Sequence, residues 1–382
     1  MTTVGRAVLR PEATPAAQAK TSRKRTRKIA GALAAIALIA AAGWQLADPG
    51  KAAAAVTGKV AVFGDINNSS GGDTPIPVFG YVCTAVKNSG ATVALSTGDA
   101  LNDIADTSTS TALARWSKVM AIESPRLDAF MPVWRTSGDN DRLDASGRLA
   151  AWNQRFSNYP TSPDPSRRWY SKNLAGMHVV FMNTTYGGHM GWMGYVSETS
   201  TGNSNQAKWL VSDLKSYTAA HPGRSTIVVV THYPLVNGKT TKPYAGSKKT
   251  EATALQKLFA KYGVDMVVTG DTHVYRRTMV TATKSGVTYR VPYIQIPPAA
   301  SSPRVFGSSP IPSLGSTEAG WAPGSSYRGF ITIGLDSTAR TLALTVNKVA
   351  VSGGAVSSAN DRKANGTALG GTFRDVPVGA TR

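Results

Sequence analysis

The sequence predicts an α/β fold on three observations. Strand-like and helix-like stretches alternate from residue 58 to about residue 347, which is typical of layered α/β proteins rather than of all-β sandwiches. Several apolar, β-branched runs stop abruptly at a Gly-Asp pair. After His273 the pattern changes to short strands, which favours antiparallel pairing. We therefore expect mixed β-sheets with helices on their faces.

Five stretches have the character of helices. In the last two, apolar residues recur at helical spacing: Leu210 with Leu214, and Leu255 with Leu258. These apolar stripes indicate packing against a core. The predicted helices cover residues 78–87, 111–122, 147–156, 205–219 and 249–262.

The predicted strands end in residues that could bind metals. Gly-Asp occurs five times, and four copies follow a strand-like run; the fifth, Gly72-Asp73, lies in a Gly/Ser/Pro-rich turn. Another run, residues 227–231, ends at His232. Ligands of open α/β sheets bind at the carboxyl ends of the strands, so these residues predict one shared site for a pair of divalent metals. The four pairs are Gly64-Asp65, Gly98-Asp99, Gly138-Asp139 and Gly270-Asp271.

The N-terminal region is typical of an exported protein. Residues 1–28 form a basic segment, residues 29–46 an uncharged apolar signal or transmembrane segment, and residues 47–57 a linker or cleavage region. The apolar run is long for a signal peptide and just long enough to span a bilayer, so a cleaved signal and a retained anchor both stay open. The positive-inside rule predicts an extracytoplasmic domain, secreted or membrane-anchored.

The remaining chain divides into a domain and a tail. We expect the domain to cover residues 58–350, with a long loop at residues 301–326, and the Gly/Ala/Ser-rich tail, residues 351–382, to be disordered. The formal charge is +20, and outside residues 1–55 there are 33 basic and 20 acidic residues. This excess favours anionic partners such as phosphate esters, cell-wall polymers or membrane lipid, and no specific nucleic-acid recognition is indicated. Cys83, the single cysteine, lies in an apolar run and is expected to be buried.

In chain order, the strand-end residues resemble the motif blocks of the calcineurin-like metallophosphoesterases, and more narrowly their purple-acid-phosphatase-like branch. Residues 170–184 resemble the central hairpin of that family, and the resemblance covers about residues 58–350. It implies two packed mixed β-sheets flanked by helices, a four-layer αββα sandwich. The blocks are Gly64-Asp65-Ile66-Asn67, Gly98-Asp99-Ala100-Leu101-Asn102, Gly138-Asp139-Asn140-Asp141, Thr231-His232-Tyr233-Pro234 and Gly270-Asp271-Thr272-His273.

The resemblance also implies roles for these residues. The first metal would be held by Asp65 and His273, completed by Asn67 or Asn102, and Asp99 would bridge both metals. The second would be held by His232, Asp139 and Asp271. The catalytic candidates are Asn140, Asp141 and Arg277, and Arg142 is a further candidate for binding phosphate oxygens.

Several of these positions differ from the family pattern. Asp139 stands where the family has Asn, Asn140 where it has its mechanistic His, and Asp271 where it has a ligand His. Asp139 and Asp271 can still bind a hard cation through oxygen. Four carboxylates in one site favour Mn, Fe, Mg or Ca over Zn.

The function implied is that of an exported metallophosphoesterase, a hydrolase of phosphate mono- or diesters that works by attack of a metal-bridging hydroxide. Two alternatives stay open. One is a non-catalytic domain that binds metal and phosphorylated ligands through a degenerate site, which the Asn at position 140 motivates. The other is a cationic surface protein that binds cell-wall polyanions.

Overall fold

The computed structural model describes a layered α/β domain within the compact unit Ala55–Arg382. No helix among the described residues is long and apolar enough to cross a membrane, and the apolar segment 29–46 lies outside them. The structure describes residues 57–68, 77–161, 164–185, 205–223, 225–236, 246–284, 287–303, 319–321, 327–336, 341–350, 352, 354–359, 361–363, 368–369 and 372–374.

The first sheet combines parallel and antiparallel strands. Its order is β13-β12-β11-β1-β2-β3, with β1, β2 and β3 parallel and β11 and β12 antiparallel to their neighbours. The register pairs Val60 with Val93 and with Ile333, so β1 lies between a parallel and an antiparallel neighbour. The strands are β1 (Thr57–Phe63), β2 (Val93–Ser96), β3 (Val133–Arg135), β11 (Arg328–Asp336), β12 (Thr341–Val349) and β13 (Val356–Ala359).

The second sheet has the order β15-β14-β10-β8-β9-β7-β6-β5-β4. Strands β5, β6, β7 and β9 run parallel to one another. Strand β4 pairs antiparallel with β5, and β8 pairs antiparallel with β9 and β10. The strands are β4 (Tyr170–Leu174), β5 (Met177–Phe181), β6 (Ile227–Thr231), β7 (Met266–Thr269), β8 (Arg276–Lys284), β9 (Val287–Gln295), β10 (Ala319–Trp321), β14 (Asp361–Lys363) and β15 (Ala368–Leu369).

The alternation of side chains along each strand builds two cores. In β6, Val228 and Val230 join the core shared with the first sheet, whereas Ile227 and Val229 join a second core with Leu210 of α5. Since successive side chains of a strand point to opposite faces, a fully apolar strand can serve both cores. The domain is therefore a four-layer αββα sandwich, as predicted.

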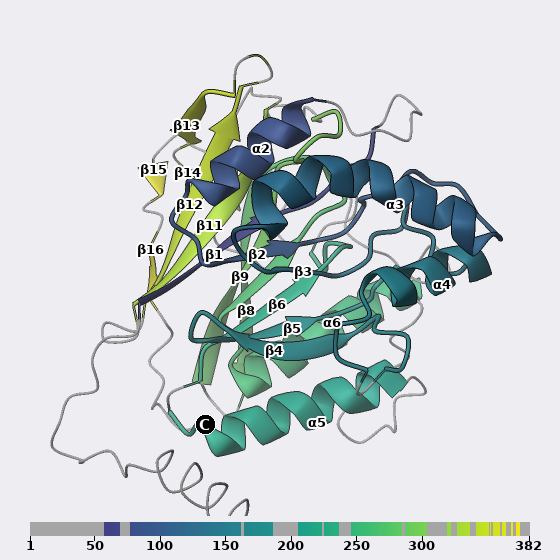
Figure 1. The fold of residues 1–382 in the computed structure, drawn as a ribbon. Helices are drawn as coiled ribbons and strands as arrows, with labels where there is room; N and C mark the ends of the chain where they lie inside the picture. The colour runs from purple at the N-terminus through teal and green to yellow at the C-terminus, as the bar shows by residue number, and fades with distance from the viewer. Residues whose placement is uncertain are drawn as a thin grey trace, which may run out of the picture. The chain divides into compact units, whose positions relative to one another are not determined.

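Helices cover the outer faces of both sheets (Figure 1). On the first sheet lie α2 (Val78–Lys87) and α3 (Thr109–Glu123), which continues into a short π-helical turn, η1 (Ser124–Asp128), and packs against α4 (Ser146–Arg155). The second sheet carries α5 (Asn205–Ala220) and α6 (Gly246–Tyr262). Every predicted helix is confirmed to within three residues at each end.

The tail differs from its prediction. Residues 351–382 contain β13, β14, β15 and β16 (Thr372–Arg374), and both β13 and β16 pair with β12. Within the predicted loop 301–326, residues 319–321 form β10. Expected disorder is wrong for these strands because the edges of the sheets offer free backbone donors and acceptors, which composition does not reveal.

Candidate functional site

The carboxyl ends of strands from both sheets meet at one place. The Asp65 amide donates to the Gly98 carbonyl at 3.0 Å, which joins the ends of β1 and β2. In the second sheet the Gly270 amide donates to the His232 carbonyl at 3.0 Å, joining the ends of β6 and β7. The Asp271 amide donates to Asp65 Oδ1 at 3.0 Å and links the two sheets. The convergence predicted from the Gly-Asp pairs is therefore present.

The glycines of these pairs allow the strand ends to approach closely. A Cβ added at Gly138 would lie 2.0 Å from Asp99 Oδ1, and one at Gly98 would lie 2.2 Å from the Gly138 amide nitrogen. A Cβ at Gly64 would lie 1.9 Å from Thr97 Oγ1. Each distance is shorter than any non-bonded contact, so only glycine fits.

Several residues of the site have left-handed backbone conformations. The φ angles are 52° at Asp65, 56° at Asp99, 66° at Asp271 and 54° at His273. Asp tolerates this region better than most residues, yet each instance still has an energetic cost. Strained backbone of this kind concentrates at functional sites.

His232 lies at the centre of the candidate metal ligands. Its Nδ1 donates to the Thr97 carbonyl at 2.9 Å, which leaves Nε2 facing the carboxylates. From Nε2 the distances are 3.2 Å to Asp139 Oδ1, 3.4 Å to Asp99 Oδ1 and 3.9 Å to Asp271 Oδ1. Two groups of ligand atoms within 4.8 Å of one another share this histidine: Asp65, Asp99 and His232, and Asp139, His232 and Asp271.

The second group is the set predicted for the second metal. The first group contains Asp65 and Asp99, as predicted for the first metal, together with His232; the predicted His273 and Asn67 or Asn102 are not in it. His273 Nε2 lies 3.4 Å from Asp65 Oδ1, and its Nδ1 donates to the Ser302 carbonyl at 3.0 Å. His273 therefore lies beside Asp65, and His232 lies in the compact group with Asp65 and Asp99, so both histidines are near the predicted first-metal ligands. Sequence spacing could not distinguish the two histidines because the choice depends on how the sheets pack.

Burial and mutual repulsion shift the pKa values of the metal-free site. Burial raises the pKa of Asp99 well above its usual range; His232 opposes the rise, and the nearby Asp139 and Asp65 add to it. Burial also raises the pKa of Asp65, but the hydrogen bond and charge of His273 outweigh it and the net shift is downward. Burial lowers the pKa of His232, yet the carboxylates, Asp99 first, raise it well above 6.5.

The residues present suit a hard divalent cation. Asp65 Oδ2 is buried and has no hydrogen-bond partner within the described part of the chain, and a Cβ at Gly270 would lie 2.7 Å from it. An unpaired buried carboxylate oxygen is costly unless a cation binds it. With oxygen ligands in the majority and one shared imidazole, the site could hold Mn, Mg, Fe or Ca.

Asn140 and Asp141 form hydrogen bonds to other residues of the site. The Asn140 amide donates to Asp99 Oδ1 at 2.9 Å, and its Nδ2 donates to Asp99 Oδ2. The Asp141 carboxylate accepts backbone N–H groups from both neighbouring loops, at 2.7 Å from Gly138 and 3.0 Å from Asp99, Ala100 and Leu101. Asp141 therefore connects the two loops through hydrogen bonds, and its catalytic role stays a prediction.

The remaining predicted site residues, two asparagines and two arginines, differ in their contacts and burial. Asn67 Oδ1 accepts a hydrogen bond from the Ser301 hydroxyl, and the Asn102 carbonyl accepts one from Arg148 Nη2 at 3.0 Å. Arg277 is buried within β8. The Arg142 guanidinium is engaged by Asp144 at 2.9 Å and Asp103 at 2.7 Å. Arg142 is thus compensated by surface carboxylates.

Sequence reasoning missed Tyr233. Its hydroxyl donates to Asp139 Oδ2 at 2.9 Å, so it contacts a predicted ligand directly. Its position immediately after His232 at a strand end was the available signal, but a tyrosine beside a ligand usually packs in a core.

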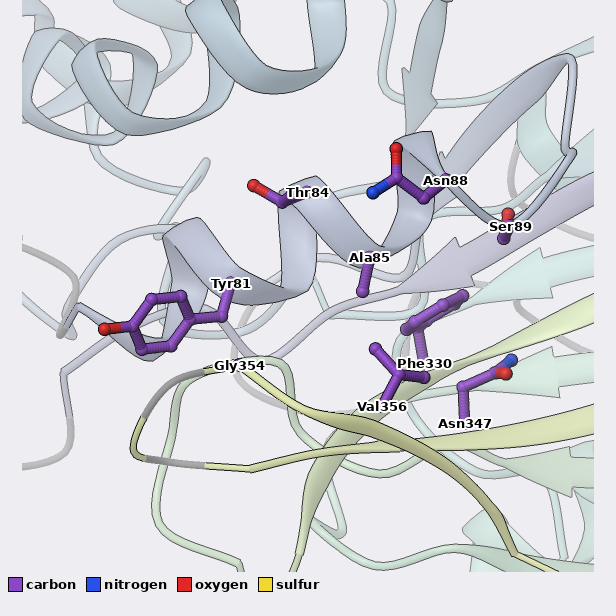
Figure 2. Close-up of a pocket in the computed structure, with 9 residues that line it drawn as sticks. All are labelled: Tyr81, Thr84, Ala85, Asn88, Ser89, Phe330, Asn347, Gly354 and Val356. Carbon is purple, nitrogen blue, oxygen red and sulfur yellow. The ribbon is translucent and has the colours of Figure 1, made fainter.

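A cavity of about 360 Å³ lies elsewhere, between α2 and the strands β11 and β12 (Figure 2). Asn88 and Asn347 provide polar groups, and Phe330 and Val356 provide apolar surface. None of the residues lining it is charged or belongs to the strand-end cluster. It therefore offers a phosphate ester no cationic side chain and no candidate metal ligand.

A four-layer αββα sandwich with a carboxylate–histidine cluster at the strand ends defines a metallophosphoesterase type of protein. Residues 58–275 match the calcineurin-like phosphoesterase family, and because they make up more than half of the 382 residues, the chain belongs to that family. The resemblance noted from the motif blocks is confirmed.

Two relatives show how far the similarity extends. The chain is 28% identical over 140 residues to purple acid phosphatase 21 of Arabidopsis thaliana, which covers 36% of this chain and 27% of that protein. The solved structure of the purple acid phosphatase PPD1 from yellow lupin (Lupinus luteus) seeds matches with a TM-score of 0.55 and 15% identity, covering 86% of this chain and 55% of that chain. The second likeness is one of fold, and the chain spans only part of either relative.

Proposed function

We propose that the chain is a metal-dependent phosphoesterase whose reaction centre is the carboxylate–histidine cluster at the strand ends. One observation carries the proposal: two compact ligand groups share His232 in a site where carboxylates outnumber histidines. Such a cluster repels a phosphate ester when it is empty, since both are anionic. It becomes a phosphate site once divalent cations lie between the carboxylates and the ester. The residues that would hold the two cations are Asp65, Asp99, Asp139, His232, Asp271 and His273.

In the proposed reaction, the cations and the protein residues have different tasks. Two divalent ions supply Lewis acidity, a nucleophile from water at neutral pH, and neutralisation of developing negative charge. The protein keeps His232 in one tautomer through the Thr97 carbonyl, and keeps Asp99 in one orientation through Asn140. The burial of Asp65, Asp99 and His232 excludes water from one side of the site.

The altered residues narrow the substrate class. A carboxamide at position 140 cannot protonate a leaving group, so esters with good leaving groups should react best. A monoester dianion meets roughly twice the repulsion that a diester monoanion meets from each carboxylate that the metals leave uncompensated. We therefore propose a preference for activated phosphodiesters over monoesters.

The decisive experiment measures bound metal and turnover on the same purified protein. The protein is stripped with chelator, reloaded with Mn²⁺, and given a chromogenic diester and a monoester of the same leaving group. We expect two Mn²⁺ per chain, activity that depends on the metal, and a higher kcat/KM for the diester. Full activity in excess chelator with no bound metal would refute the proposal.

A second candidate is a non-catalytic domain that binds metal and phosphorylated ligands. The engagement of Asn140 with both oxygens of Asp99 favours it, because no acid stands at that position. Two bound Mn²⁺ with no turnover of either ester, and retention of inorganic phosphate in equilibrium dialysis, would support this candidate over the enzyme.

We further propose that the domain works outside the cytoplasm, secreted or membrane-anchored. The support is the basic segment 1–28 followed by the apolar segment 29–46, together with the basic excess in the rest of the chain, which suits anionic cell-wall or membrane surfaces. Protease added to intact cells should digest the domain and spare a cytoplasmic control protein. A domain protected until the cells are lysed would contradict this location.

A further inference from the structure

The two carboxylate oxygens of Asp139 have different partners. Oδ1 lies 3.2 Å from His232 Nε2, on the side where the candidate ligands gather. Oδ2 accepts a hydrogen bond from the Tyr233 hydroxyl at 2.9 Å. The Asp139 side chain is 17% exposed, whereas Asp65, Asp99 and Asp271 are almost fully buried. Packing therefore restrains Asp139 less than its neighbours, and hydrogen bonds contribute to its orientation: Asn140 Nδ2 donates to Oδ1 at 3.4 Å, and the Tyr233 hydroxyl donates to Oδ2.

Tyr233 is itself held firmly. Its amide donates to Thr184 Oγ1 at 3.1 Å, and Thr184 Oγ1 lies 2.7 Å from Thr231 Oγ1 in the preceding strand. The ring packs against the core formed by the second sheet with α5 and α6. Since Tyr233 directly follows His232, the end of β6 positions both the candidate ligand His232 and the phenol that contacts Asp139.

We propose that Tyr233 is a positioning residue that makes Asp139 a one-oxygen metal ligand. The phenol occupies Oδ2, whereas Oδ1 is the oxygen that lies 3.2 Å from His232 Nε2. Outer hydrogen bonds of this kind orient metal-binding carboxylates and tune the affinity of a site. The inference deepens the proposed function and rests on it, because it assumes that Asp139 binds a metal.

The pairing also accounts for the unusual residue at position 139. The family pattern there is Asn, whose side chain offers a single oxygen to a metal. An Asp offers two, and a second free oxygen could bind in a different geometry or turn away to solvent. A phenol on one oxygen restores the single-oxygen character, so Asp139 and Tyr233 form a compensating pair.

The test is a double-mutant cycle with Mn²⁺ affinity as its readout. The variants are Tyr233→Phe, Asp139→Asn and the two combined, and bound Mn²⁺ is measured by loss of the free-ion EPR signal. Tyr233→Phe should weaken the weaker of the two Mn²⁺ sites by about ten- to a hundredfold. In the Asp139→Asn background the same change should cost less than about threefold, because no second carboxylate oxygen remains to be restrained.

Tyr293→Phe is the matched control. Tyr293 is buried in β9, and its hydroxyl has no hydrogen-bond partner among the described residues, so the change removes the same atom and no known contact. Its Mn²⁺ affinity should equal that of the wild type, and thermal melts of all variants report folding.

The outcomes separate the two proposals. Two Mn²⁺ sites of wild-type affinity in folded Tyr233→Phe would overturn the positioning role and leave the proposed function intact. Equal losses from Tyr233→Phe with and without the Asp139→Asn change would overturn the one-oxygen account. A wild-type protein that binds no Mn²⁺ would instead refute the metal centre itself, and this inference with it.

Discussion

Two regions of the molecule contain buried charged residues, and they differ in the ratio of acidic to basic side chains. In the first core, Glu123 and Arg135 form a one-to-one ion pair, both almost fully buried. At the strand ends, four carboxylates gather around two histidines. A buried charge is tolerated better when a partner of opposite sign compensates it, and in the core pair the two formal charges balance. The strand-end cluster holds more carboxylates than basic groups, which suits it to bind cations.

The backbone conformations of the two regions differ as well. Glu123 is the last residue of α3 and Arg135 the last of β3, in regular structure, and neither has a positive φ. At the site, Asp65, Asp99 and Asp271 all have positive φ. The core pair follows from ordinary secondary structure, whereas the cluster is held in strained conformations that only its surroundings maintain.

The environments of the pairs complete the contrast. The Arg135 guanidinium carbon lies 5.1 Å from the Phe156 ring centroid and 5.7 Å from that of Trp116, so aromatic faces cover its charge. Buried polar atoms without a hydrogen-bond partner among the described residues occur in both regions, at Asp65 Oδ2 and at Glu123 Oε2, Arg135 Nε and Arg135 Nη1, so the balance of charge is what separates them. The balanced charges of Glu123 and Arg135 suit a structural role, whereas the excess of carboxylates at the strand ends is typical of a cation-binding site.

Removing a carboxylate from the cluster is expected to have the largest effect. Asp99→Ala should reduce kcat/KM on the order of a thousandfold or more, because it removes a buried carboxylate of the first ligand group that also lies 3.4 Å from the shared His232. The free energy of unfolding of the metal-free protein should stay the same or rise, since a repelling buried charge is gone. Urea melts in chelator and kinetics in Mn²⁺ measure the two quantities. Asp103→Ala, at an exposed carboxylate paired with Arg142, is the control and should leave kcat/KM unchanged.

Breaking the core pair should give the opposite pattern. Glu123→Ala leaves Arg135 buried without a counter-charge and should cost about 3–5 kcal/mol in the free energy of unfolding. Mn²⁺ stoichiometry should not change. Replacing both residues, by Glu123→Leu with Arg135→Met, should recover most of the loss. A double replacement as unstable as Glu123→Ala would show that the pair contributes more than mutual neutralisation.

Replacing Asp141 should affect both the stability of the fold and the binding of metal. Asp141→Asn removes a carboxylate that accepts backbone N–H groups from two loops and should destabilise the fold by about 2 kcal/mol. Because those loops carry Asp99 and Asp139, Mn²⁺ affinity should fall too. A variant with wild-type stability and affinity but no turnover would support the catalytic role of Asp141.

The smallest effect expected is a pH dependence from Glu123. Burial raises its pKa to about 7 from an ordinary 4.5, and Arg135 only partly opposes the rise. A folded pKa above the unfolded one favours the protonated form in the native state. Stability from this group is thus fully present below about pH 4.5 and is lost as pH rises toward 7. Urea unfolding of the wild type in chelator at pH 5 and pH 8, compared with Glu123→Gln, should isolate it. Parallel pH profiles for the two proteins would exclude Glu123 as the source.

Much of the fold and of the site could be read from local patterns. Helical periodicity located α5 and α6 because each buries one stripe of residues, and the apolar runs located β6 and β7 because both of their faces are buried. The Gly-Asp pairs identified the strand ends, since close approach requires the glycine and the metal requires the carboxylate. The tail strands were missed because pairing at a sheet edge depends on backbone groups rather than on side-chain pattern.

By itself, the sequence determined the α/β class, the order of the elements and the identity of the residues that end the strands. These properties depend on neighbours within a few positions along the chain. Only the tertiary structure shows that His232 lies close to Asp65 and Asp99 while His273 contacts Asp65, that Asp141 accepts backbone N–H groups, and that the Tyr233 hydroxyl donates to Asp139. Each of these contacts joins residues of different loops, and distances of a few ångströms between them are set by how two sheets pack, which no local pattern encodes.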